Sequence, residues 1–204
     1  MDSNEVRRQW AERSGEYSPE YYAYYGPDER SETILHHLDR FVDRDARVLE
    51  LGCSSGRHLA HLFDNGFENL SGVEVNADAF DVMAETYPDL FDSGTFYHDA
   101  IENVAEDFED DAFDAVYSVE TLQHLHPDVE WVFEDLARIT ADLLVTVENE
   151  GEGDSQSSGP AVNYVREDVP LYYRDWNRIF TELGLVEVDA ESDGRDTTRV
   201  FRAT

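Results

Sequence analysis

The sequence predicts an α/β fold with a doubly wound, mostly parallel β-sheet. Short apolar runs alternate with helical patterns along most of the chain, and a glycine-rich turn links the first run to a helix. The last two runs are joined by Ser192-Asp193-Gly194, a hairpin signal. At 204 residues and 41% hydrophobic content, the chain is long enough for one domain with a sizeable core. We expect a single domain over residues 1–204, with a helical N-terminal arm (1–40) and a sheet core (45–204).

The N-terminal arm combines two helical patterns with a cluster of tyrosines. The first pattern runs from Val6 to Ser14 around Trp10, and the second from Asp28 to Leu38. Between them, Tyr17 begins a stretch with five tyrosines in nine residues. Tyrosines combine a large contact area with hydroxyl groups, so we expect a lid over the site, with simple packing of an amphipathic arm as the alternative.

The remaining elements follow in order. The expected strands are 48–51, 70–75, 95–98, 113–119, 143–147, 186–190 and 197–201. The expected helices are 57–63, 77–86, 128–140 and 175–183. The helix over 128–140 has apolar residues at helical spacing, which indicates a face directed at the core. The segment 149–159 is rich in glycine, serine and acids and is expected to be a flexible loop.

The glycine-rich turn is the central feature. It reads Val48-Leu-Glu-Leu-Gly-Cys-Ser-Ser-Gly-Arg57, a strand, a turn of small residues and the start of a helix. Glycines let the backbone approach a ligand closely, and a helix start offers free N–H groups with partial positive charge. Glu74, at the end of the second strand, can accept hydrogen bonds from both hydroxyls of a ribose. The pair predicts a nucleotide-binding corner.

These features resemble the S-adenosylmethionine-dependent methyltransferases of the seven-stranded Rossmann-like (class I) type. Their signature, acid-x-Gly-x-Gly-x-Gly, stands here as Glu50-x-Gly52-x-Ser54-x-Gly56, with serine for the middle glycine. The resemblance implies a seven-stranded sheet ending in an antiparallel hairpin, and S-adenosyl-L-methionine as cofactor.

The resemblance also assigns roles to residues. Glu50 and the turn would hold the methionine end of the cofactor, Glu74 the ribose, and Asp99 and Ala100 the adenine. Without the family, Asp99 is equally consistent with capping a helix that begins at Ile101. The full set of expected cofactor-binding residues is Tyr17, Glu50, Gly52, Cys53, Ser54, Gly56, Glu74, Val75, Asp99, Ala100 and Ser118.

Methyl transfer is an in-line displacement, so an enzyme mainly aligns the acceptor and excludes water. His124 is the candidate base for a protonated acceptor; the alternative is a histidine packed beneath the cofactor. The segment Glu120–Leu125 resembles the corresponding segment of small-molecule methyltransferases. It lacks the Asn/Asp-Pro-Pro-Tyr motif, which the resemblance links to methylation of base or glutamine amide nitrogens. Arg166 and Arg174 are candidates to bind an anionic acceptor, or to pair with surface acids. The expected substrate-binding residues are Tyr21, Tyr164, Arg166, Tyr173 and Arg174.

Several alternatives stay open. Gly52–Gly56 also spells G-x-S-x-G, the α/β-hydrolase elbow with Ser54 as nucleophile, but no strands are expected upstream to build its oxyanion hole. A dinucleotide fingerprint would need a third glycine that is missing from the register. The turn could also bind nothing, or belong to a cofactor-binding subunit without transfer activity.

Composition restricts the possible partners. There are 47 acids against 15 basic residues, all of them arginine, giving a net charge of −32. Concentrated salt screens such self-repulsion, so we expect a halophilic protein, with an acidic surface for a basic partner as the alternative. The negative charge disfavours binding to nucleic acid, whose phosphates are also negative. The single cysteine excludes a disulfide framework or a cysteine-ligated zinc site. The N-terminus lacks the features of a signal peptide and no run is long enough to span a membrane, so we expect a cytoplasmic protein. The oligomeric state is not indicated.

Overall fold

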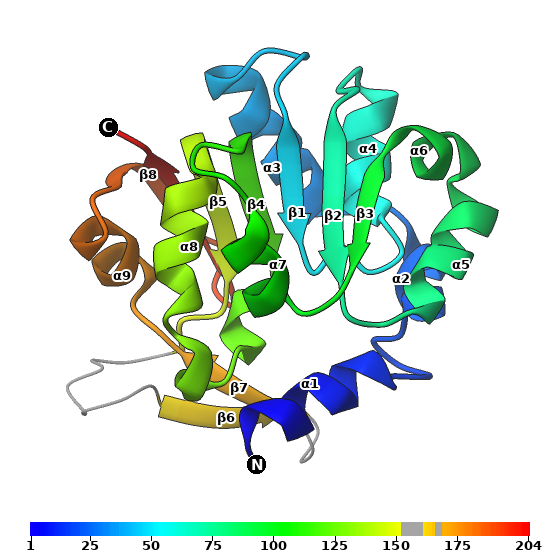
Figure 1. The fold of residues 1–204 in the computed structure, drawn as a ribbon, viewed down its shortest axis with the longest axis horizontal. Helices are drawn as coiled ribbons and strands as arrows, with labels where there is room; N and C mark the ends of the chain where they lie inside the picture. Colours follow the sequence, from blue (N-terminus) through cyan, green and yellow to red (C-terminus); the bar gives the residue numbers. More distant parts are fainter. Residues whose placement is uncertain (152–160, 166–168) are drawn as a thin grey trace.

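The computed structural model describes residues 1–151, 161–165 and 169–204, and it confirms the predicted fold class (Figure 1). Its main sheet has seven strands in the order β3-β2-β1-β4-β5-β9-β8. The first five strands pair in parallel, and β9 is antiparallel to both β5 and β8. The strands are β1 (Val48–Leu51), β2 (Leu70–Glu74), β3 (Thr95–His98), β4 (Phe113–Val119), β5 (Thr140–Glu148), β8 (Val186–Ser192) and β9 (Thr197–Arg202).

Helices cover both faces of this sheet. The α-helices of the described ranges are α1 (Ser3–Ala11), α2 (Pro19–Tyr25), α3 (Glu29–Phe41), α4 (Arg57–Asp64), α5 (Asp78–Thr86), α6 (Pro88–Ser93), α7 (Ile101–Asp107), α8 (Val132–Ile139) and α9 (Trp176–Glu182). One core contains side chains of α3, α4, α5 and α6, and the other contains side chains of α7, α8 and α9.

Strand alternation explains the two cores. In β1, Val48 belongs to the core under α3 and α4, while Leu49 and Leu51 belong to the core under α7 and α8. Successive side chains of a strand point to opposite faces, so a strand covered on both sides must be apolar at nearly every position. The exception in β1 is Glu50, a carboxyl group that is buried like its apolar neighbours.

The structure differs from the sequence prediction in several elements. The tyrosine-rich stretch contains a helix, α2, whose Pro19 follows the capping residue Ser18. The segment after residue 160 forms an antiparallel pair, β6 (Ala161–Val165) with β7 (Val169–Tyr173), where no strands were expected. The helix expected from Asp128 starts at Val132, after a 3₁₀ turn over Pro127–Val129. Proline fixes φ and lacks an N–H, which suits the first turn of a short helix.

The chain order reverses between β1 and β4, and this reversal positions the site. Connections from β1 lead toward β2 on one side, whereas β4 leads toward β5 on the other. Such a reversal leaves a crevice at the carboxyl ends of the strands. Figure 1 shows α1 and the β6–β7 pair along that edge, below the strand ends in this view. Within the described ranges, every helix is too short or too polar to cross a bilayer.

Candidate functional site

A pocket opens at the carboxyl ends of β1, β2, β3 and β4, and α1 and α2 complete its wall. The turns after four parallel strands meet here, so residues far apart in the sequence share one cavity. The predicted site residues on its wall are Tyr17, Glu50, Gly52, Cys53, Ser54, Glu74, Val75, Asp99, Ala100 and His124.

The glycine-rich turn adopts the close-packed geometry that its sequence predicts. Gly52 has φ +71° and Gly56 has φ +78°, in the region that favours glycine. A Cβ on Gly52 would lie 2.4 Å from Thr121, and one on Gly56 would lie 2.9 Å from Met83. Ser54, in the place of the middle glycine, has φ +47° and so takes a glycine-like conformation at a steric cost.

Glu74 ties this turn to the end of β2. Its carboxylate accepts hydrogen bonds from the backbone N–H groups of Ser54 (2.9 Å), Val75 (2.7 Å) and Asn76 (2.8 Å). Burial raises the pKa of Glu74, and the three N–H donors oppose that rise. A carboxylate has about four acceptor positions, so the backbone leaves capacity for a ligand hydroxyl.

Glu50 lies at the base of the pocket. Its carboxylate accepts a hydrogen bond of 3.0 Å from the hydroxyl of Tyr117, and only 1% of the residue is exposed. Burial raises the pKa of Glu50 well above its usual value, with Tyr117 and the Arg57 charge acting in the opposite direction. A carboxyl group held this way is suited to meet a cationic group such as the ammonium of an amino acid.

Asp99 and Ala100 follow β3 at the edge of the pocket. The Asp99 carboxylate accepts hydrogen bonds from the Asn103 side chain (2.8 Å) and the Ala100 N–H (2.7 Å), which lower its pKa. The helix α7 does begin at Ile101, but its N-cap residue is Ala100 and no side chain caps it, so Asp99 holds the Ala100 N–H and the Asn103 amide without acting as the helix cap. A ligand that used the Ala100 N–H would have to replace this local hydrogen bond.

The N-terminal arm supplies aromatic groups to the wall. The Trp10 ring lies against the His124 ring, with centroids 4.7 Å apart. The Arg13 guanidinium lies near the rings of Trp10 and Tyr17, at 5.9 Å and 5.7 Å. The Asn76 amide donates to the carbonyls of Trp10 (3.3 Å) and Arg13 (3.2 Å). The arm is thus attached to the turn after β2, next to Glu74.

His124 lies in the short 3₁₀ helix η1 (Leu122–His124) after β4. Its Nδ1 is 3.0 Å from the carbonyl of Pro170 in β7, and its Nε2 is 3.4 Å from the Gln123 amide nitrogen. A carbonyl only accepts, so Nδ1 carries the proton and Nε2 carries the lone pair. Burial lowers the pKa of His124 to about 4, which keeps the ring neutral.

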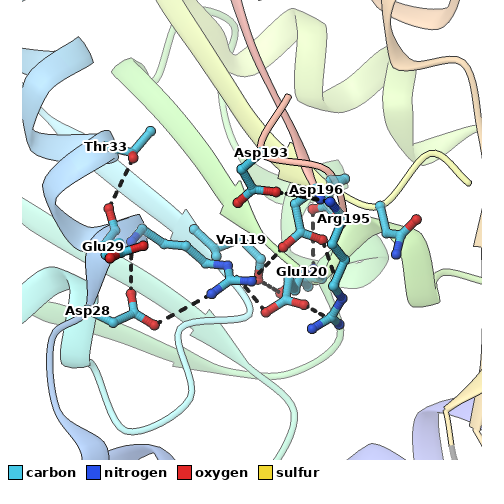
Figure 2. Close-up of polar contacts among 12 residues, drawn as sticks. Asp28, Glu29, Thr33, Val119, Glu120, Asp193, Arg195 and Asp196 are labelled. Carbon is cyan, nitrogen blue, oxygen red and sulfur yellow. Dashed lines mark hydrogen bonds and ion pairs between the residues drawn. The ribbon is translucent and has the colours of Figure 1, made fainter. Parts of the chain in front are cut away.

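Glu120, between β4 and η1, links the pocket wall to a charged cluster (Figure 2). Its carboxylate pairs with Arg195 at 2.6 Å and with Arg30 at 3.5 Å, and Arg30 also pairs with the buried Asp196 at 2.5 Å. Burial raises the pKa of Glu120 despite these cations. The cluster joins α3, the turn after β4 and the β8–β9 hairpin, so the C-terminal hairpin supports the pocket wall.

Other predicted site residues lie away from the pocket wall. Gly56 packs on Met83, Ser118 is fully buried and donates to Glu148, and the Tyr21 ring packs at a tilted angle against Tyr17. The remaining predicted residues belong to the β6–β7 region or lie outside the described residues.

Tyr164 is 53% exposed on β6, and the Tyr173 hydroxyl accepts a hydrogen bond from Asn163 at 2.8 Å. Arg174 is buried, and its guanidinium contacts protein groups around η1. Arg166 and most of the predicted loop 149–159 lie outside the described residues.

Several residues of the wall were not predicted as site residues. The most informative are Trp10, Tyr22, Asn76, Arg57 and His58. Asn76 and Arg57 directly follow predicted cofactor-binding residues. Extending the glycine-rich turn and the end of the second strand by one position includes them. Trp10 and Tyr22 come from the arm that was expected to cover the site, but no local pattern shows which of its rings line the pocket.

Comparisons with known proteins agree with this geometry. Residues 48–142 match a family model described as a methyltransferase domain. A comparison with curated proteins finds no match. Solved structures share the fold at low sequence identity.

One such structure is a Burkholderia thailandensis 1,6-didemethyltoxoflavin-N1-methyltransferase with 1,6-didemethyltoxoflavin and S-adenosylhomocysteine bound (17% identity, 86% of this chain, 77% of that chain, TM-score 0.66). Another is a putative sarcosine dimethylglycine methyltransferase from Galdieria sulphuraria (16%, 86% and 85%, TM-score 0.68). A third is a complex of the Haloferax volcanii Trm112 methyltransferase activator with a putative methyltransferase (20%, 84% and 88%, TM-score 0.66).

The residues that line the pocket fit S-adenosylmethionine. The turn after β1 permits close backbone approach at Gly52, a carboxylate follows β2, and a buried carboxyl lies at the base of the pocket. Residues 48–142 therefore match a methyltransferase domain, and the chain shares the class I fold of S-adenosylmethionine-dependent methyltransferases of known structure.

Proposed function

We propose that the protein methylates a small-molecule acceptor bound between the cofactor turn and His124. The observation that carries this proposal is the continuity of the pocket wall from Ser54 and Glu74 to His124, whose ring packs against Trp10 of α1. A wall that the N-terminal arm completes suits a small acceptor. Two of the similar structures are named for small-molecule methylation.

The proposed roles follow from the contacts. Glu50 and the Gly52–Ser54 backbone hold the amino-acid end of the cofactor, Glu74 the ribose, and Asp99 the adenine side. Bound S-adenosylmethionine supplies an electrophilic methyl group on a sulfonium. The protein aligns an acceptor lone pair with that methyl carbon and keeps water out, which is most of what an in-line displacement needs.

His124 is the proposed proton acceptor. When the acceptor forms its bond to the methyl carbon, the carbon–sulfur bond breaks and its electron pair stays on sulfur. The acceptor must then lose a proton, and the Nε2 lone pair of His124 can take it if the acceptor displaces the Gln123 amide, 3.4 Å away. A ring whose pKa is about 4 releases this proton readily to water.

The first experiment is calorimetric titration with S-adenosylmethionine and S-adenosylhomocysteine in molar potassium chloride. The second measures release of S-adenosylhomocysteine with a panel of amines, phenols and heteroaromatic N–H compounds. Micromolar cofactor binding with turnover of a panel member supports the proposal. Binding without turnover favours a cofactor-binding subunit, and no binding by the folded protein overturns the proposed site.

The pH dependence of turnover tests the role of His124. Because burial lowers its pKa to about 4, the ring is already neutral at higher pH. We expect kcat to be constant from about pH 5 upward and to fall below that value, where the ring gains a proton. In His124→Gln, kcat should fall about 10²- to 10⁴-fold, the usual contribution of a general base. A wild-type kcat that declines already below pH 7 would contradict the assignment.

A further inference from the structure

The turn that carries His124 is held from one end by a buried carboxylate. Glu148, the last residue of β5, is fully buried. Its carboxylate accepts hydrogen bonds from the backbone N–H groups of Thr121 (3.2 Å), Leu122 (3.0 Å) and Gln123 (3.2 Å), and from the Ser118 hydroxyl. These are the free N–H groups at the start of η1, which otherwise would be buried without partners.

The other end of the same turn is held by a buried cation. Arg174, which follows β7, has a side chain only 2% exposed. Its guanidinium donates to the carbonyls of Leu122 (3.3 Å) and Leu125 (2.6 Å), and it pairs with Glu130 at 2.9 Å. Three aromatic rings surround it, those of Phe133, Tyr172 and Trp176.

The two charges match the polarity of the turn. A helical turn has partial positive charge at its N–H end and partial negative charge at its C=O end. Glu148 lies at the first end and Arg174 at the second. Each buried charge depends on the groups that it contacts, since an isolated charge in the interior is very costly.

The imidazole of His124 is fixed by neighbours of the same two residues. Pro170 lies in β7 and Arg174 directly follows that strand, and the Pro170 carbonyl accepts a hydrogen bond from the Nδ1–H of His124. Asn149, next to Glu148, donates its N–H to the Gln123 side-chain oxygen at 2.7 Å. That bond directs the Gln123 amide nitrogen toward Nε2.

We propose that Glu148 and Arg174 are positioning residues, which hold the turn 121–125 at its two ends and thereby fix the orientation of His124 in the pocket. This inference rests on the proposed function for its catalytic meaning. Its structural content, the fixed ring and tautomer of His124, can be measured without turnover.

The decisive variant is Arg174→Lys, which keeps the charge but cannot bridge two carbonyls and a carboxylate, because lysine is a point donor without a planar fork. Arg178→Lys is the matched control, since Arg178 makes an exposed pair with Glu182 on α9. Glu148→Gln is the second variant, because its amide turns one acceptor into a donor facing N–H groups. If Glu148→Gln fails to fold, Arg174→Lys alone tests whether the turn 121–125 is held in place for His124.

The first readout is the ¹⁵N NMR spectrum of the His124 ring with S-adenosylhomocysteine present. The wild type and Arg178→Lys should show one tautomer, protonated at Nδ1. In Arg174→Lys we expect a mixture of tautomers or exchange broadening, while calorimetry gives an S-adenosylmethionine affinity within about threefold of wild type. An unchanged ring spectrum in Arg174→Lys overturns the inference.

The second readout uses the best acceptor of the panel. Arg174→Lys should lower kcat at least 30-fold with little change in KM, whereas in a His124→Gln background the same substitution should cost less than threefold. Equal losses in both backgrounds would overturn a role through His124. If the wild type binds no cofactor, the proposed function fails, and the ring spectrum still decides the positioning role.

Discussion

Three residues with side chains, Tyr17, Ser54 and Glu120, have positive φ angles of 65°, 47° and 49° and line the pocket. Such conformations cost of order 1 kcal/mol each and persist only where surrounding contacts impose them. Here those contacts include the Glu74 carboxylate, which holds the Ser54 N–H, and the arginines that hold Glu120. Strain concentrated in one wall is consistent with a site that is shaped before its ligands arrive.

Glu74→Ala tests the ribose assignment. Loss of charge-assisted hydrogen bonds should weaken S-adenosylmethionine binding by roughly 1–3 kcal/mol, or about 5- to 150-fold in Kd. The measurement is calorimetric titration, with thermal unfolding to confirm that the turn remains folded. Glu68→Ala, which removes an exposed acid before β2, is the control for charge alone. Unchanged affinity in a folded Glu74→Ala protein would remove Glu74 from the site.

Two buried histidines make stability depend on pH. Burial lowers the pKa of His58 to about 3 and that of His124 to about 4. Between these values and about 6.5, the unfolded chain binds a proton at each position that the folded chain does not. Each ring therefore makes the free energy of unfolding rise with pH by about 1 kcal/mol per unit in that window. The buried Glu148, with a pKa raised to about 7, acts in the opposite direction.

Because these effects oppose each other, variants should be compared with the wild type. We expect the pH slope of the unfolding free energy to fall by about 1 kcal/mol per unit between pH 4 and 6.5 in His124→Gln or His58→Gln. Urea unfolding at a series of pH values measures it. His36→Gln is the control, because it replaces an exposed imidazole on α3. A His124→Gln slope equal to that of His36→Gln would show that His124 gains its proton in the folded protein.

At the scale of elements, the turn after β1 and the turn after β4 pack directly together. Gly52 faces the side chain of Thr121, the first residue held by Glu148. The cofactor turn and the His124 turn are therefore in direct contact, and a change at Gly52 should reach both.

Gly52→Ala tests this contact. The added Cβ would lie 2.4 Å from Thr121 at a φ of +71°, so both strain and collision oppose it. We expect a loss of about 2–4 kcal/mol in unfolding free energy and weaker cofactor binding. Gly184→Ala is the matched control, because Gly184 has φ +95° and open space around a new Cβ. If the two variants are equally stable, the contact with Thr121 contributes nothing.

For the whole molecule, the net charge of −32 sets the conditions for stability. Repulsion among exposed acids is screened over about 10 Å in 0.1 M salt and about 3 Å in 1 M salt. Many arginines of the described segments pair with acids, as Arg30 does with Asp196 and Arg199 with Glu150. We propose that the protein is adapted to high salt.

The salt dependence of unfolding tests this proposal. We expect the urea midpoint to rise between 0.1 M and 1 M potassium chloride as screening reduces repulsion in the folded state. Glu106 and Glu109 are exposed acids close together in the sequence. Replacing both with glutamine should reduce the rise of the urea midpoint with salt. A midpoint that does not change with salt would mean that repulsion is not what limits stability.

Local patterns were sufficient for the sheet and the cofactor turn. Strand runs, the glycine spacing and Glu74 depend on interactions within a few residues, and the structure places them as expected. The β6–β7 pair and α2 were missed, because prolines and tyrosines are compatible with both loops and regular elements. Arg174 was expected to meet the acceptor, but its guanidinium contacts backbone carbonyls around η1.

The sequence by itself determined the α/β architecture, the positions along the chain of its parallel strands and closing hairpin, and the glycine-rich turn of the pocket, since periodicity and turn chemistry are local. Only the tertiary structure decided which distant side chains complete the pocket. The Trp10 ring packs against His124, and Arg195 forms an ion pair with Glu120. Glu148 and Arg174 form hydrogen bonds with the two ends of one turn. The physical reason is that burial and charge pairing at these positions depend on chain segments far apart in the sequence, which only the folded sheet brings together.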